Sequence, residues 1–425
     1  MTAAGWVAAD GLALSMPAHP EALRAGGADF LTQAFHASGA LAADNRVLRV
    51  TRCEDATGGS TGRKMRLDVE YARPQPGLPT DLFVKFSRDF DDPVRDRAKV
   101  QMASEIRFAQ LSRTPGFPIA VPACLFAGWH AETATGLLIA QRIGFGVDGV
   151  EPHREKCRDT ELPAPLAHYR ALLGAVARLA GTHRGGGLPA GVSEQFPFAF
   201  ENVAVGVRAP YTADQLRTRV TRFAAFATAH PALLPANLRT PAFHTRLMDE
   251  VPNVAAHAEA IQAELAGWKD AIALCHWNAN VDNAWFWRGP DGTLACGLMD
   301  WGCVGSMNVA MAIWGAMSGA EVALWDEHLD TLLEEFAHEF HRSGGAVLDV
   351  ARLKRHLLLY AGLMGLTWLL DAPAYIRSQV PQLDAVETRF DPRLRANEIA
   401  RTQLQMLTVF LNLWETGGIG ALVHA

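Results

Sequence analysis

The chain has 425 residues, of which 49% are hydrophobic and 20% are charged, and its formal net charge is -6 at pH 7. This length predicts two or three domains, because one domain usually takes roughly 100–200 residues. The composition is typical of a globular protein, and without a basic excess we expect no nucleic-acid partner.

The six cysteines lack the close spacing of zinc sites and disulfide scaffolds, so we expect reduced thiols in a cytoplasmic protein. The N-terminus lacks the positively charged segment that would indicate a signal peptide. The longest apolar run covers residues 356–370, which is shorter than the roughly 20 residues that a membrane-spanning helix needs. We therefore expect a buried helix there and no membrane span.

The N-terminal part of the sequence predicts a mostly antiparallel sheet with one crossing helix. Residues 65–71 alternate apolar with charged side chains, which is typical of a half-buried strand. A glycine-rich turn separates them from the apolar residues of 47–50, so the two segments predict a β-hairpin. The other elements expected here are a helix at 28–42, a strand at 81–87, a helix at 92–113 and a strand at 136–143.

The rest of the sequence predicts mainly helices. A proline near its start and a glycine run at its end delimit a helix within 164–187. Residues 212–270 also predict helices, and after Asp300 we expect helices almost to the C-terminus. The breaks expected within the second segment lie at Pro231, Pro235, Pro241 and Pro252. A small β-rich part followed by a large helical part is an α+β layout with two lobes, which we place at 1–143 and 144–425.

Residues 274–302, LCHWNANVDNAWFWRGPDGTLACGLMDWG, contain the polar pattern that points most directly to chemistry. Two apolar runs are separated by a turn with Asp291-Gly292, which predicts a β-hairpin. Asn283 immediately precedes the first run and Asp300 immediately follows the second. A hairpin would therefore bring an amide oxygen and a carboxylate side by side. Such hard oxygen ligands suit an Mg²⁺ ion that also holds nucleotide phosphates.

Three features of the N-terminal part are ambiguous when each is taken alone. The glycines of TGGSTGRK, residues 57–64, would let backbone N–H groups approach phosphates, or they form an ordinary hairpin turn. Lys85 has apolar neighbours in LFVKF, where it is either a solvated edge residue or a charge directed into a cleft. Glu105, on the following helix, fits either a solvated face or an ion pair with Lys85.

The order of glycine loop, strand lysine, helix glutamate, polar loop and Asp-Trp-Gly resembles the aminoglycoside phosphotransferase and choline kinase superfamily, which has a bilobal protein-kinase-like fold. The usual loop of that family reads His-Gly-Asp-x-His-x-x-Asn and is followed by Asp-Trp or Asp-Phe. The positions that match are His276, Asn283, Asp300 and Trp301. The positions that depart are Trp277, Asn278 and Asn280. Asn308 also stands where the family often carries an aspartate that braces the loop.

The resemblance implies ATP and Mg²⁺ as cofactors. It assigns the nucleotide-binding positions to Gly58, Gly59, Ser60, Lys85, Ala140 and Arg142, the last two through backbone contacts with the adenine. Glu105 would hold the lysine on the α- and β-phosphates. Asn283 and Asp300 would bind the metal. His276 would belong to the catalytic residues and would support the loop.

At position 278 the family carries an aspartate that accepts or orients the proton of the attacking hydroxyl. The amide of Asn278 does not take up a proton at neutral pH, and a positioned general base typically contributes about 10²–10⁴-fold. Phosphoryl transfer relies mainly on positioning and charge neutralisation, so Asn278 could still orient the hydroxyl in a slow enzyme. Asp282 is an alternative base, although an aspartate beside the metal-binding asparagine is a familiar variant of such loops.

The sequence thus predicts an ATP-dependent phosphotransferase that moves the γ-phosphate to a hydroxyl of a small molecule. A second hypothesis is a pseudokinase-type protein that binds a nucleotide or metabolite without turnover. A third is nucleotidyl transfer or hydrolysis on the same fold. The acceptor pocket is expected in residues 150–265 and 305–425. Whether the acceptor is cationic or lipophilic, and which oligomer the chain forms, stay open.

Overall fold

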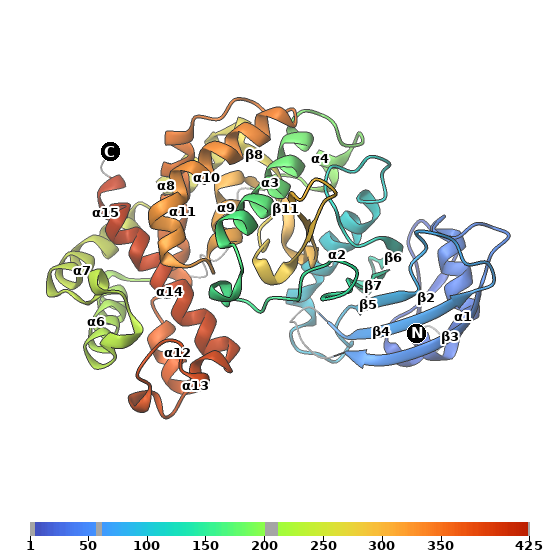
Figure 1. Ribbon diagram of the computed structural model, residues 1–425, viewed down its shortest axis with the longest axis horizontal. Coiled ribbons are helices and arrows are strands. Elements are labelled where there is room, and N and C mark those ends of the chain that lie inside the picture. Colours follow the sequence, from blue (N-terminus) through green and yellow to red (C-terminus); the bar gives the residue numbers. More distant parts are fainter. Residues whose placement is uncertain (1–4, 57–61, 200–210, 424–425) are drawn as a thin grey trace. The chain divides into compact units, whose positions relative to one another are not determined.

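The computed structural model describes residues 5–56, 62–199 and 211–423, and every structural statement below refers to these residues. The chain divides into two compact units. Unit 1 consists of Met1–Val150, Pro189–Phe196 and Gly297–Val304, and unit 2 consists of Glu151–Leu188, Pro197–Cys296 and Gly305–Ala425. The larger sheet belongs to unit 1 and most helices belong to unit 2 (Figure 1). The predicted α+β class, with a β-rich first part and a large helical second part, is therefore confirmed.

Unit 1 contains a five-stranded antiparallel sheet in the order β3-β4-β5-β7-β6. Its strands are β3 (Val47–Ala56), β4 (Lys64–Tyr71), β5 (Asp81–Phe86), β6 (Cys124–His130) and β7 (Thr135–Gln141). In β4, Met65 and Leu67 are buried and the intervening Arg66 is exposed, as the alternation predicts. The predicted hairpin and the strands predicted at 81–87 and 136–143 are confirmed.

Two helices cover opposite faces of this sheet. Helix α1 (Pro20–Ala37) packs Phe30 into a core that includes Leu137 of β7. Helix α2 (Arg95–Leu111) contributes to a second apolar cluster, against which Leu138 packs. Because successive residues of a strand point to opposite faces, the two clusters lie on opposite sides of the sheet.

Helix α1 begins and ends earlier than the helix predicted at 28–42. Pro20 occupies its first turn, and the side chain of His19 accepts a hydrogen bond from the N–H of Ala22. Gly27 interrupts the helical backbone with a φ of 51°, which explains why the first half of α1 shows no regular apolar period. The short strands that precede it, which were not predicted, are β1 (Trp6–Ala8) and β2 (Ser15–Pro17).

Two pairs of short strands bracket the polar loop. The pairs are β8 (Ile272–His276) with β11 (Val304–Asn308), and β9 (Ala284–Arg288) with β10 (Leu294–Leu298). The second pair confirms the predicted hairpin, whose turn places Gly292 at a φ of 78°, a conformation that glycine adopts readily. Strand β11 corrects the expectation that the chain becomes helical directly after Asp300. Its sequence, VGSMN, carries no apolar alternation that would have indicated a strand.

Helices make up most of unit 2. They include α3 (Pro165–Arg184), α6 (Ala213–Ala229), α7 (Pro241–Ala256), α8 (Ala258–Gly267), α9 (Val309–Met317), α10 (Val322–Arg342), α11 (Val350–Trp368), α12 (Ala372–Gln379) and α14 (Glu398–Thr416). The break predicted at Pro252 is wrong, because this proline lies inside α7. Its neighbours Val251 and Val254 are fully buried, and this packing offsets the loss of one backbone hydrogen bond.

The apolar run at 356–370 falls largely in α11, where the residues from 357 to 366 are buried, as expected for a core helix. Among the residues that the structure describes, no single helix is both long and apolar enough to cross a membrane. Helices α11 and α12 meet that requirement only together, with a bend of 50° between them.

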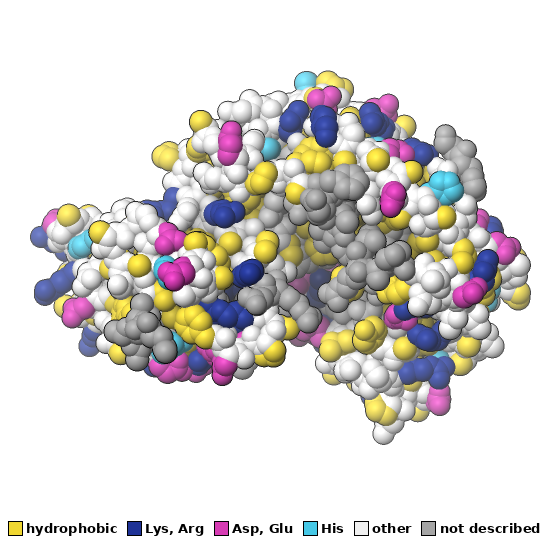
Figure 2. Space-filling model, turned by 180° about the vertical axis from the view of Figure 1, so that it is seen from behind, with side chains coloured by type: hydrophobic (Ala, Val, Ile, Leu, Met, Phe, Trp, Pro, Cys, Tyr) yellow, Lys and Arg dark blue, Asp and Glu magenta, His cyan; other side chains and the backbone are white. Residues whose placement is uncertain are grey.

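Charged side chains of both signs are spread over the face drawn in Figure 2. This mixture matches the composition, in which 45 acidic residues slightly outnumber 39 basic ones.

Candidate active site

Lys85 in β5 is the centre of a buried ion cluster within unit 1. Its Nζ donates to both carboxylate oxygens of Glu105 in α2, at 2.9 and 2.7 Å, and to Oδ1 of Asp300 at 2.8 Å. Lys85 and Glu105 are only 3% and 4% exposed. The sequence left open that Lys85 is an exposed edge residue and that Glu105 lies on a solvated face. Both alternatives are wrong, and the expected ion pair is present.

The geometry of β5 explains why this lysine meets α2. Val84 and Phe86 turn into the core shared with α1, so the intervening Lys85 points to the opposite face. Burial alone would lower the pKa of Lys85, but the negative charges of Glu105 and Asp300 outweigh burial and raise it. The ammonium group is therefore ionised at neutral pH.

Asp300 reaches this lysine from an unusual backbone conformation. It precedes the short 3₁₀ helix η6 (Trp301–Cys303) with φ 60° and ψ 67°, a left-handed region that few non-glycine residues adopt. The ring of Trp301 stacks on Phe108 of α2, with 3.7 Å between ring centroids, and anchors the segment on that helix. The Asp300 side chain is 41% exposed, so the carboxylate joins the buried cluster to solvent.

A second lysine lies beside this cluster. Lys64 opens β4, stands opposite Lys85 in the antiparallel register and is 9% exposed. Burial lowers the pKa of Lys64 and the charge of Lys85 lowers it further, against the opposite effects of Asp300 and Glu105. Sequence reasoning missed this residue. The alternation that turns Met65 into the core would have placed Lys64 on the side of Lys85.

The residues predicted to cradle phosphates, Gly58, Gly59 and Ser60, lie outside the described residues. Immediately after them, a Cβ atom on Gly62 would lie 1.9 Å from the carbonyl oxygen of Phe86. Only glycine permits such a close approach of two backbones. The end of the glycine-rich segment is therefore pressed against the strand that carries Lys85.

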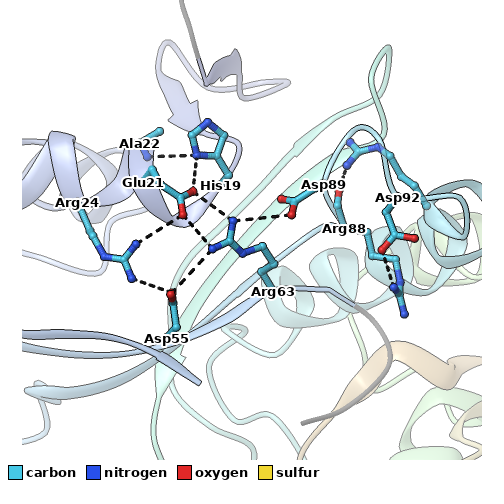
Figure 3. A network of polar contacts seen from close by, with 10 residues as sticks. His19, Glu21, Ala22, Arg24, Asp55, Arg63, Arg88, Asp89 and Asp92 are labelled. Carbon is cyan, nitrogen blue, oxygen red and sulfur yellow. Dashed lines mark hydrogen bonds and ion pairs between the residues drawn. The ribbon is translucent and has the colours of Figure 1, made fainter. Parts of the chain in front are cut away.

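Arg63 connects this point to α1. Its guanidinium pairs with Glu21 at 2.9 Å, with Asp89 at 3.7 Å and with Asp55 at 4.0 Å. Figure 3 shows Arg63 between these three carboxylates. All four side chains are at least one-third exposed, so each pair alone contributes little stability. Together they tie both strands that flank the glycine-rich segment to the start of α1.

Ala140 and Arg142, expected to contact the adenine, lie at the end of β7. Ala140 pairs with Phe83 of β5 and Cys124 of β6. The backbone N–H of Arg142 donates to the carbonyl oxygen of Asp81 at 3.0 Å, and its Nε donates to the carboxylate of Asp81 at 2.7 Å. The backbone N–H of Arg142 is therefore already hydrogen-bonded within unit 1, and its contact with the adenine stays a prediction.

The polar loop begins in unit 2 where β8 ends at His276. The imidazole is fully buried, and its Nδ1 accepts a hydrogen bond from the N–H of Asn278 at 3.2 Å. This bond ties the imidazole to the loop backbone, and the supporting role of His276 stays a prediction.

The amide of Asn278 has a fixed orientation. Its Oδ1 accepts from Nδ2 of Asn280 at 2.7 Å and from Nζ of Lys156 at 3.4 Å. A lysine ammonium only donates hydrogen bonds, so the atom that faces Lys156 must be the oxygen. The other amide atom, Nδ2, is a donor. Asn278 can therefore donate to a hydroxyl oxygen, but its oxygen is already engaged and it cannot take up a hydroxyl proton.

Asn283 and Asp300 offer the oxygen ligands expected for Mg²⁺. Nδ2 of Asn283 donates to the carbonyl oxygen of Asn278 at 2.9 Å, which leaves Oδ1 as the atom of this side chain suited to a cation. Asp300 adds a partly exposed carboxylate. The donor set fits Mg²⁺, which takes one or two carboxylates and the phosphates of its substrate. Because the two residues belong to different units, their joint binding of one ion stays a prediction.

Metal sites of another kind are not found in the described part of the chain. No group of three or more His, Cys, Asp or Glu side chains there is arranged to hold a metal ion.

The other departures from the family pattern are bonded within unit 2. Nε1 of Trp277 donates to the hydroxyl of Tyr360 at 2.7 Å. A Cβ on Gly315 of α9 would lie 1.6 Å from the carbonyl oxygen of Trp277, so α9 packs directly on the loop. Asn308 caps α9 by accepting a hydrogen bond from the N–H of Ala310 at 3.0 Å. The loop is thus held from two sides.

Two carboxyl groups of unit 2 have buried oxygen atoms. Oδ1 of Asp282 is buried and has no hydrogen-bond partner among the described residues, so Asp282 stays an alternative base. Asp159 is 2% exposed, and burial raises its pKa to about 7 even though the hydroxyl of Tyr169 donates to it. Nothing in the sequence near Asp159 indicates this buried acid.

No protein-family model and no curated protein sequence matches this chain. Among solved structures, it is similar to a microcompartment-associated aminopropanol kinase, with 13% identity over 87% of this chain and 94% of that one and a TM-score of 0.45. It is also similar to choline kinase from Cryptosporidium parvum, with 10% identity over 87% and 91% of the two chains and a TM-score of 0.42. A third similar structure is spectinomycin phosphotransferase with ADP and spectinomycin, with 11% identity over 89% and 93% and a TM-score of 0.40.

Proposed function

We propose that this protein is an ATP-dependent phosphotransferase that transfers the γ-phosphate to a hydroxyl of a small molecule. The observation that supports this most is the buried Lys85, bonded to Glu105 and Asp300. In kinases, a strand lysine held by a helix glutamate contacts the α- and β-phosphates. Burying the charges of Lys85 and Glu105 is costly even where the two compensate each other, so their presence beside the partly exposed Asp300 favours a role for their charge.

Asp300 and Asn283 would hold the metal. Mg²⁺, when bound, would neutralise charge that develops on the transferred phosphoryl group. The carboxylate of Asp300 would then divide its contacts between Lys85 and the cation, which its partial exposure permits. Lys85 would keep the non-transferred phosphates in place.

Asn278 would orient the acceptor by donation. Its Nδ2 would hydrogen-bond the hydroxyl oxygen, and the hydroxyl proton would leave to water or to an oxygen of the transferred phosphoryl group. Without a general base the reaction loses a contribution of about 10²–10⁴-fold. We therefore expect a slow enzyme.

A pseudokinase-type binding protein is the second candidate. The observation that favours it is the engagement of the Asn278 oxygen by Asn280 and Lys156, which leaves this oxygen occupied and unable to accept a hydrogen bond from the attacking hydroxyl. This candidate shares the nucleotide site and differs in lacking turnover.

We propose a small-molecule alcohol as the acceptor and the cytoplasm as the compartment. Among the described residues, none of the six cysteines is paired in a disulfide, which suits a reducing environment.

The test is ADP formation from ATP and Mg²⁺, measured with water alone and with a panel of alcohols. Asn278→Asp should raise the rate by about tenfold or more, because a carboxylate can take up the hydroxyl proton and can also accept from the same two donors, Asn280 and Lys156. Asn278→Leu, which has neither donor nor acceptor, serves as the matched control and should lower the rate. Nucleotide binding without ADP formation in any of the three proteins would favour the pseudokinase candidate.

A further inference from the structure

A small cavity in unit 2 is lined mainly by arginine side chains. Its volume is about 30 Å³, and since one water molecule needs about 10–15 Å³, this space takes a group of a few atoms such as a carboxylate or a phosphate. The charged residues of the lining are four cations and one anion: Arg158, Arg389, Arg395, Arg401 and Glu321. Cations gathered around a small hollow attract an anion into it.

The arginines of this lining outnumber the carboxylates that pair with them. The ion pairs among the described residues are Arg389 with Glu321, Arg395 with Glu161, Arg401 with Glu155, and Arg158 with both Glu155 and Glu161. Four guanidinium groups thus share three carboxylates, and the set carries a net positive charge. The neighbouring Asp159 balances this charge only in part at neutral pH, because burial raises its pKa to about 7.

Arg158 has hydrogen-bond donors that the fold does not use. A guanidinium group has five N–H donors, and that of Arg158 makes one hydrogen bond to the described residues, from Nη2 to the carbonyl oxygen of Arg395 at 3.5 Å. Its Nε is buried without a hydrogen-bond partner there, although a carboxylate oxygen of Glu155 lies 3.2 Å away. Carboxylates and phosphates match the fork of an arginine with two oxygens at once, so an anion in the cavity would supply the acceptors that Arg158 lacks.

Lys156 connects this cavity to the polar loop. Nε of Arg401, in the lining, donates to the backbone carbonyl oxygen of Lys156 at 2.9 Å. The side chain of the same lysine reaches Oδ1 of Asn278 at 3.4 Å. The cavity and Asn278 are therefore about one lysine side chain apart, within the same unit.

We propose that the acceptor is a short alcohol that also carries a carboxylate or a phosphate, and that the four arginines hold this anionic group in the cavity while the hydroxyl lies at Asn278. The role as acceptor rests on the proposed function, whereas the anion site does not. In the transfer, the hydroxyl oxygen forms a bond to the γ-phosphorus of ATP and the bond from that phosphorus to the bridging oxygen of ADP breaks. The hydroxyl proton leaves to water or to an oxygen of the transferred group.

The test compares four alcohols with three carbon atoms each: glycerate, glycerol phosphate, glycerol and the cationic serinol. Calorimetry measures their binding to the unmodified protein, to Arg158→Met and to Arg393→Met. Arg393 is the matched control, because it lies in the short helix α13 (Pro392–Arg395) outside the lining and pairs with Asp391, with 38% of its side chain exposed.

At least one of the two anions should bind about tenfold or more tightly than glycerol and serinol, and the tighter anion identifies the group as a carboxylate or a phosphate. Arg158→Met should weaken that anion by about 10- to 100-fold, because hydrogen bonds between charged groups are the stronger ones. Arg393→Met should bind as the unmodified protein does. If Arg158→Met does not fold, Arg389→Gln, which removes another cation of the lining, is measured in its place.

The anion site is overturned if neither anion binds more tightly than glycerol or serinol, or if the arginine variant binds the anion within about twofold of the unmodified protein. ADP formation from ATP and Mg²⁺ with the same four compounds separates this inference from the proposed function. Anion binding without ADP formation from any of them supports the anion site and counts against the phosphotransferase. ADP formation with serinol or glycerol but not with the anions supports the phosphotransferase and overturns the anionic acceptor.

Discussion

Replacing Lys85 by methionine should destabilise the protein by about 3–5 kcal/mol, the usual cost of breaking a buried ion pair on one side. The distance from Nζ to Oε2 of Glu105 is 2.7 Å. At an effective dielectric constant of about 20, two unit charges at that distance attract by about 6 kcal/mol. Most of this attraction offsets the desolvation of two side chains that are 4% and 5% exposed. The variant loses the attraction but still buries the carboxylate of Glu105.

The assay is urea unfolding followed by circular dichroism, with the free energy taken from the midpoint and slope. The double variant Lys85→Met with Glu105→Leu buries no lone charge at this place and should recover at least about half of the loss. Lys354→Met is the control, because this lysine pairs with Asp330 in solvent, with 39% and 69% of the side chains exposed, and should cost at most about 1 kcal/mol. A Lys85→Met variant as stable as the control, or a double variant no better than the single one, would refute the reasoning.

Three further predictions concern the loops and a buried acid. Gly62→Ala should destabilise the protein by about 1–3 kcal/mol and weaken ADP binding, because the added methyl group would lie 1.9 Å from the carbonyl oxygen of Phe86. Urea unfolding midpoints measure the first effect and calorimetry the second. Gly77→Ala is the control for backbone strain, because Gly77 also has a positive φ but has open space around it. In Gly315→Ala the added Cβ would lie 1.6 Å from the carbonyl oxygen of Trp277. The variant should therefore displace that carbonyl and lower any ADP formation while ADP binding persists; equal rates in the variant would contradict this prediction. Asp159 has a pKa raised by burial from 3.8 to about 7, so the folded state binds its proton more tightly than the unfolded state, and stability should fall as pH rises between these values. The loss from about pH 5 to about pH 8 should be about 2–3 kcal/mol and should vanish in Asp159→Asn, as measured by urea unfolding at both pH values; the same pH dependence in the variant would contradict this assignment.

Local sequence patterns correctly predicted the elements whose apolar residues recur regularly or whose ends carry a turn signal. The alternation in β4 and the Asp291-Gly292 turn predicted strands that the structure contains. The start of α1 was not predictable from its apolar period, because Gly27 interrupts the helix and a proline with a histidine cap defines its first turn. Strand β11 has no pattern of its own and depends on its pairing with β8.

The candidate site was predictable where residues occur in a known order and not where contacts are tertiary. Lys85 and Glu105 were expected as a pair from that order alone. The engagement of Asn278 by Lys156 joins residues 122 positions apart, and no local feature marks Lys156. Lys64 was within reach of the alternation argument, because Met65 beside it turns into the core.

The central claim is that this chain binds a nucleotide through Lys85 and a metal through Asp300. The most direct measurement is a calorimetric titration with ATP, in the presence and absence of Mg²⁺, of the unmodified protein and of Asp300→Asn. We expect binding that Mg²⁺ strengthens in the unmodified protein, and a loss of that strengthening in Asp300→Asn. No heat of binding from ATP in either condition, with a folded protein, would contradict the claim.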